Sequence, residues 1–171
     1  SHMWDKSAQY LRKMGGLILV ASLFVWFLSY FPRPVAGEPE IEHYENSYLG
    51  QLGRWCEPAV EPLGLNWKAG VAILSGVSAK EIVVSTLGVL YSQDATADDA
   101  SLAQTLRESG DFTPASALAF LVFVLLYFPC IATIVAVRNE AGRGWALASM
   151  VYSTAVAWFV AWIVYHIALL L

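Results

Sequence analysis

Lys80 and Glu81 stand side by side within an apolar stretch, residues 69–91, that carries no other charge. They divide it into halves of roughly ten residues, each about 15 Å long as helix, whereas a bilayer core is about 30 Å thick. A charge at mid-membrane costs about 2.5–3.5 kcal/mol on insertion scales, so the pair needs a partner, water or a function. The alternative is that Lys80 reaches an interface and Glu81 makes one structural contact.

Small residues precede this pair. Ser75, Gly76 and Ser78 supply a flexible segment with helix-capping side chains, which favours a broken helix whose second half begins near Ser78. The positive end of that half-helix would face a cavity, as in the discontinuous helices that carry solute sites in many transporters. The sequence therefore predicts a gate-like hairpin around Lys80 and Glu81.

A proline and a cysteine interrupt a second apolar run. Pro129 removes a backbone N–H and clashes with the carbonyl four residues back, that of Leu125. Inside a membrane a freed carbonyl must be satisfied by protein, water or an ion. Cys130 offers a soft sulfur ligand of the kind that transition metals prefer, with Thr133 one turn on as a weaker candidate. The alternative is a kinked helix with a small buried cysteine.

Apolar helices must position these residues. The chain is 57% hydrophobic and 14% charged, against about a quarter charged in soluble domains. Uncharged runs at 14–31, 112–137 and 144–171 are each long enough to cross a bilayer. These features predict an all-α membrane protein with about three full transmembrane helices plus one broken or re-entrant helical hairpin.

The remaining segments are polar. Residues 1–3 look like the remnant of a cleaved expression tag, and residues 4–171 are expected to form a single transmembrane domain with polar loops at 32–68 and 92–111. The basic N-terminus favours a cytoplasmic start and an external first loop. If 69–91 re-enters rather than spans, the basic turn 138–143 is also cytoplasmic, which fits the positive-inside rule better, and the C-terminus is external.

Several function classes are not expected. The net charge of −4 argues against nucleic-acid binding. The two cysteines, Cys56 and Cys130, form no CxxC or Cys/His spacing of the kind that binds metals. The sequence has no GxxxxGK[ST], GxGxxG or HExxH motif. The chain is therefore not expected to be an enzyme.

The motifs GGLILVASLFVWFLSYFP, SYLGQLG, EPLGLNWKAGVAIL, SAKEIVVSTLGVLY and LLYFPCIATIVAVRNE, in this order, resemble the C-terminal membrane region of the bacterial ferrous-iron transporter family FeoB. The resemblance covers essentially all of residues 4–171 and implies the second of two gate domains in a multi-pass protein of the bacterial inner membrane. It implies Fe²⁺ as the transported ion, with no cofactor tightly bound. It makes Cys130 a candidate metal contact and places Lys80, Glu81 and Pro129 in the gate.

The resemblance also implies partners, namely the lipid bilayer, a first gate, a cytoplasmic GTPase domain and a possible homo-oligomer. Three functions are compatible with these features. The leading hypothesis is a fragment of an Fe²⁺ transporter that forms part of the permeation pathway. Glu81, itself a candidate metal residue, and the helix break would shape the pathway, and Cys130 would contact the ion transiently. The alternatives are a nucleoside-like organic-solute carrier module and a non-transporting assembly module.

Overall fold

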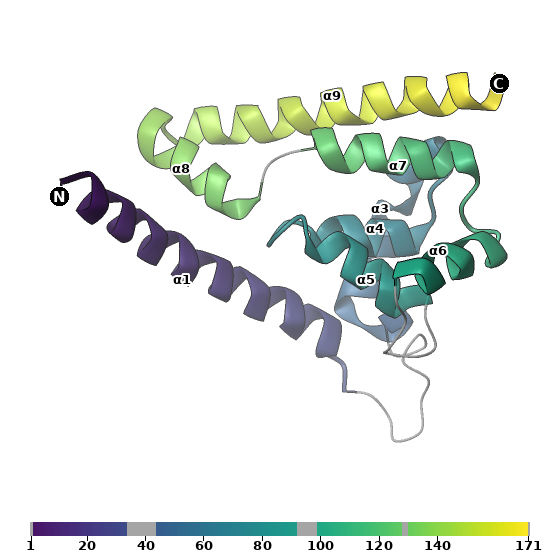
Figure 1. The fold of residues 1–171 in the computed structure, drawn as a ribbon, viewed down its shortest axis with the longest axis horizontal. Coiled ribbons are helices and arrows are strands. Elements are labelled where there is room, and N and C mark those ends of the chain that lie inside the picture. The colour runs from purple at the N-terminus through teal and green to yellow at the C-terminus, as the bar shows by residue number, and fades with distance from the viewer. Residues whose placement is uncertain (1, 34–43, 92–98, 128–129, 171) are drawn as a thin grey trace.

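The structure is a computed structural model that describes residues 2–33, 44–91, 99–127 and 130–170. Two long helices lie at the outside of the fold, α1 (His2–Tyr30) and α9 (Arg143–Leu170), and shorter ones lie between them (Figure 1). The shorter helices are α3 (Tyr48–Val60), α4 (Trp67–Ser75), α5 (Ile82–Tyr91), α6 (Asp99–Glu108), α7 (Pro114–Leu126) and α8 (Ile131–Ala141), with a 3₁₀ turn, η1 (Glu61–Leu63). The described residues contain no strand, so the prediction of an all-α fold is confirmed.

By length and apolar composition, two described stretches could cross a membrane. They are Pro114–Ala141, which includes α7, α8 and residues 128–129 outside the described part of the chain, and Arg143–Leu170, which is α9. The expected first span lies within α1, which includes the apolar stretch Ile18–Tyr30. The described part of the chain thus contains two such stretches, against the predicted count of about three full spans.

The segment predicted as a polar loop at 32–68 contains helical structure. Ser47 caps α3 by accepting a hydrogen bond from Gly50 N at 3.0 Å, and Asn66 caps α4 by accepting one from Ala69 N at 3.2 Å. Glycines let α3 and α4 pack closely, since a Cβ built on Gly53 would lie 2.9 Å from Trp67 O. The loop interpretation missed α3 because Gly50, Gly53 and Pro58 are weak helix formers.

Helices α4 and α5 form an antiparallel hairpin. Asn66, the residue before α4, donates from Nδ2 to the hydroxyl of Tyr91, the last residue of α5, at 3.1 Å. The two ends of the segment therefore lie side by side, as the re-entrant interpretation of 69–91 requires. Val71, Val83 and Leu90 on this hairpin are at most 1% exposed and belong to the core.

Large apolar side chains remain exposed on the outer helices. On α1 they include Leu19, Val20, Leu23, Phe24 and Trp26, and on α9 Leu147, Val151, Phe159, Ile163 and Leu169. Exposed apolar faces of this extent suit lipid or another protein surface better than water. Helix α9 packs its opposite side on α7 and α8, where Ala157 and Ala161 are fully buried.

Charge is distributed between the two ends of the molecule. The N-terminus of α1 and the turn between α8 and α9 lie at the left end in Figure 1, whereas α6 and the C-terminus lie at the right end. Arg138 and Arg143 flank the α8–α9 turn. Asp111, between α6 and α7, belongs to the opposite end.

Candidate functional site

The first interruption lies between α4 and α5, at residues 76–81. Ser75 donates from its hydroxyl to Val71 O at 2.9 Å, and Ser78 donates in the same way to Ser75 O at 2.9 Å. Because Ser78 turns back toward α4, it does not cap α5, which begins at Ile82. The predicted break is present, but its second helix starts four residues later than Ser78.

The second interruption lies between α7 and α8. Helix α7 ends at Leu126, and Cys130 precedes the first residue of α8 in an extended conformation with φ −54° and ψ 160°. Pro129, the residue expected to cause this break, lies outside the described residues. Cys130 is half-buried, and its Sγ lies 3.8 Å from Thr133 Oγ1.

The two interruptions meet. Ile131 N, at the start of α8, donates to Val77 O in the first interruption at 3.1 Å. A Cβ built on Gly76 would lie 2.5 Å from Tyr127 Oη and would overlap Val83 Cγ2. We call this contact region, residues 76–81 with 127, 130 and 131, the helix crossing.

Lys80 joins the two sides of the helix crossing. Its Nζ donates to the carbonyl oxygens of Val124 at 3.1 Å, Leu125 at 3.3 Å and Tyr127 at 3.4 Å. The ammonium also lies 4.7 Å from the centre of the Tyr127 ring, within cation–π range. These carbonyls belong to the last turn of α7 and its cap, where helix dipoles leave negative charge. The protein's own cation therefore satisfies them.

This pairing was not predicted from the sequence. The sequence indicated each partner separately, because Lys80 is a charge that needs a partner and Leu125 is expected to have an unsatisfied carbonyl. Their separation of 45 residues hid the contact. Tyr127, whose ring faces the ammonium, was also not recognised as part of the site.

The candidate ion ligands are less closely gathered. Glu81 is exposed, and within the described residues its carboxylate forms no salt bridge. No group of three or more His, Cys, Asp or Glu side chains in the described part of the chain lies close enough to hold a metal ion. Glu81, Cys130 and Thr133 thus form no preassembled metal centre there.

A hydroxyl-lined cavity of about 190 Å³ lies between α1 and the hairpin. The hydroxyls of Ser22, Ser29, Ser75, Ser78 and Thr86 line it together with the aromatic residues Trp26 and Tyr44 and the apolar residues Val25, Leu49 and Ile82. Ser29 donates to Trp26 O, as Ser75 and Ser78 donate to their own carbonyl partners.

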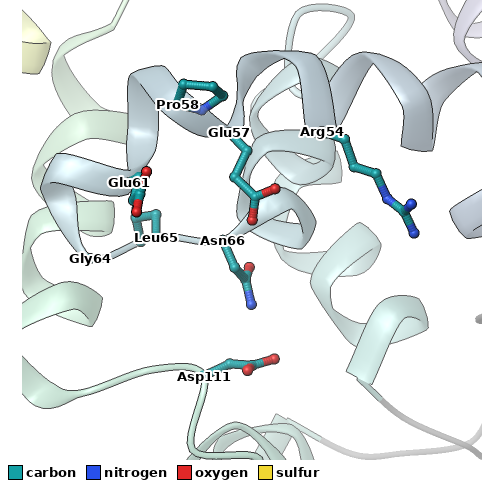
Figure 2. A pocket seen from close by; sticks show the side chains of 8 residues that line it. All are labelled: Arg54, Glu57, Pro58, Glu61, Gly64, Leu65, Asn66 and Asp111. Carbon is teal, nitrogen blue, oxygen red and sulfur yellow. The ribbon is translucent and has the colours of Figure 1, made fainter.

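A larger polar pocket of about 550 Å³ lies at the other end of the hairpin. Figure 2 shows Asn66 and Asp111 facing each other across it, with Glu57 and Arg54 on α3. Asp111 accepts a hydrogen bond from Tyr91 Oη at 3.0 Å and forms a 3.4 Å salt bridge with Lys68. This network fastens the two ends of the hairpin to the segment that follows α6.

Two interrupted helices that meet at a charged side chain resemble the discontinuous helices of membrane transporters. The chain belongs to the Gate family, whose model, described as nucleoside recognition, matches residues 11–144. Together with the relatives below, this match supports a fragment of the gate region of FeoB.

The curated relatives below are named as FeoB iron transporters. The Fe(2+) transport protein A/Fe(2+) transporter FeoB fusion protein of Porphyromonas gingivalis is 42% identical over 99% of this chain and 25% of its own length. The Fe(2+) transporter FeoB of Campylobacter jejuni is 37% identical over 99% of this chain and 28% of its own. The chain thus spans about a quarter of the length of these curated relatives. No solved structure matches.

Proposed function

We propose that this chain forms part of the path by which a transporter moves Fe²⁺ across the bacterial inner membrane, with the helix crossing as its closed gate. The observation that carries the proposal is the contact of Lys80 with three carbonyl oxygens at the end of α7. Exposed carbonyls at the end of a broken helix commonly form a cation-binding site in transporters. Here the ammonium of Lys80 occupies that position.

Lys80 would exclude a divalent cation from the helix crossing. At about 4 Å from the ammonium and an effective dielectric constant of about 20, the repulsion is roughly 8 kcal/mol. Passage of Fe²⁺ therefore requires Lys80 to move away. Glu81, on the same short turn and exposed, is a carboxylate that either the displaced ammonium or the ion could contact.

Withdrawal of Lys80 would leave oxygen ligands on one side and sulfur on the other. The carbonyls of Val124 and Leu125 are hard ligands, whereas a Cys130 thiolate is a soft ligand that favours transition metals over Mg²⁺. Thr133 adds a hydroxyl beside the sulfur. Such a mixed and incomplete set holds Fe²⁺ weakly, as conduction requires. The cavity lined by Ser75 and Ser78 would supply water next to the gate.

The proposal includes a topology. The N-terminus of α1 and the basic α8–α9 turn share one end of the fold, which the positive-inside rule assigns to the cytoplasm (Figure 1). The hairpin α4–α5 then re-enters from the external side. The exposed apolar faces of α1 and α9 would contact lipid, the first gate or a second copy of the transporter, and a GTPase domain would act from the cytoplasmic side.

The ligand role of Cys130 can be tested in the full-length transporter. Cys130→Ser should reduce Fe²⁺ uptake several-fold with unchanged membrane expression, because a hydroxyl is a poorer ligand for a soft metal. Cys56→Ser is the matched control, since Cys56 lies on α3 outside the helix crossing. Uptake by Cys130→Ser equal to that of the control would remove the ligand role.

A second candidate function follows from the description of the matching family as nucleoside recognition. A nucleoside carrier would use the same broken helices to bind an uncharged organic solute. Competition assays separate the two, because Fe²⁺ uptake by the transporter should be indifferent to excess nucleoside. An assembly module would instead be insensitive to substitution of both Cys130 and Glu81.

A further inference from the structure

Two arginines flank the turn that joins α8 to α9. Arg138 lies in the last turn of α8, and Arg143 is the first residue of α9. Both are exposed, and a groove of about 370 Å³ lies between them. The other residues that line this groove are apolar: Ile134, Ala146, Leu147 and Met150. A pair of cations thus stands at the mouth of an apolar groove between two helices.

The positive charge here lacks an acidic partner in the part of the chain that the structure describes. Neither arginine forms a salt bridge with an acidic side chain among the described residues, although Glu140 lies on the same turn. Arg143 also occupies the first turn of a 28-residue helix, where the macrodipole disfavours a cation by about 0.3–1 kcal/mol. An anion placed between the two arginines would reverse that penalty, because it would contact both guanidinium groups and the positive end of α9.

The neighbouring side chains indicate the depth of the groove in a membrane. Trp145 is 71% exposed two residues into α9, and tryptophan is typical of the interface between headgroups and acyl chains. Leu147 and Val151, each 60% exposed, continue the apolar surface along α9. The arginines would therefore lie at the level of lipid phosphates, with the apolar groove at the level of the first acyl carbons.

We propose that this groove, called here the arginine groove, binds an anionic phospholipid of the cytoplasmic leaflet. Its phosphate would bridge Arg138 and Arg143, and one acyl chain would lie along Ile134, Leu147 and Met150. Arginine suits this role because its planar fork binds phosphate oxygens in a bidentate manner. Basic pockets between transmembrane helices on this side of a membrane are suited to anionic headgroups. An acidic segment of a partner protein would match the charge but not the apolar walls.

The test uses this chain in neutral detergent micelles and follows its thermal unfolding midpoint as lipid is added. Phosphatidylglycerol at a hundredfold excess over its Kd should raise the midpoint by roughly 5–10 °C. The double variant R138Q/R143Q should lose that shift, whereas R107Q, which removes an exposed arginine from α6, should keep it.

Two further arms identify the source of the anion. Phosphatidylcholine should give a much smaller shift, and inorganic phosphate alone should give none, because neither combines a net negative charge with acyl chains. An equal shift with phosphatidylcholine, an equal shift in R138Q/R143Q, or a full effect of inorganic phosphate would each overturn the proposal. Retention of phosphatidylglycerol by the purified chain but not by R138Q/R143Q, measured by native mass spectrometry, would support it without reliance on stability.

Discussion

The ammonium nitrogen of Lys80 lies 3.3 Å from the carbonyl oxygen of Leu125, 45 residues further along the chain. This contact joins two helix interruptions, each of which would be costly alone in an apolar environment. A half-buried ammonium needs acceptors, and the end of α7 needs donors. Each interruption thereby supplies what the other lacks, which explains how both can persist in one membrane domain.

Removal of the Lys80 charge should destabilise the fold. Lys80→Met keeps most of the apolar stem but removes the donor to the α7 carbonyls, and hydrogen bonds to charged groups contribute about 1.5–3 kcal/mol each. We expect the free energy of unfolding in detergent to fall by about 2 kcal/mol, on the order of one such bond. Lys68→Met, which removes a salt bridge to Asp111 near the surface, should lower it by about 0–1 kcal/mol. Equal losses in both variants would contradict the bridging role of Lys80.

Gly76 should not tolerate a side chain. An added methyl group would overlap Val83 and approach Tyr127 Oη at 2.5 Å, so Gly76→Ala should separate the helix crossing and lower stability by about 1–3 kcal/mol. Gly88→Ala, in α5 of the same hairpin, is the matched control because nothing lies within 4 Å of its built Cβ. Thermal unfolding of both variants in detergent measures the difference. A Gly76→Ala variant as stable as Gly88→Ala would show that the close approach is unimportant.

The hairpin topology can be tested by thiol labelling in intact cells. Burial raises the pKa of the Cys56 thiol, which slows its reaction with maleimides, but a background without Cys56 and Cys130 removes both native thiols. In that background Ser109→Cys should react with an impermeant maleimide from outside. Asn139→Cys should react only after the membrane is opened. The reverse pattern would mean that residues 69–91 span the bilayer instead of returning.

The sequence indicated the elements better than their contacts. The free-energy cost of placing a charge in the membrane and the lengths of the two apolar halves of 69–91 located the break at Lys80 and Glu81. Both quantities depend only on neighbouring residues. The start of α5 was misplaced because Ser78 was expected to cap it, yet the hydroxyl bonds back to Ser75 O. Capping choices of this kind depend on the direction in which the chain turns, which residue types alone do not specify.

The site was predictable only in part for the same reason. Proline chemistry identified Leu125 as a carbonyl in need of a donor, and membrane energetics identified Lys80 as a charge in need of acceptors. Joining them required the hairpin to lie against the second break, a long-range arrangement that local patterns do not encode. Helix α3 was missed because Gly50, Gly53 and Pro58 are weak helix formers that tertiary packing overrides.

The claim that the helix crossing is a gate held shut by Lys80 is tested most directly by Fe²⁺ influx into liposomes that contain the full-length transporter, measured without nucleotide. Lys80→Met should raise this basal influx several-fold, because no tethered cation then blocks the α7 carbonyls. Lys80→Arg, which retains the charge, and Lys68→Met, which lies outside the helix crossing, should both stay near the wild-type level. Basal influx through Lys80→Met no higher than through Lys68→Met, with the variant folded and correctly inserted, would contradict the account.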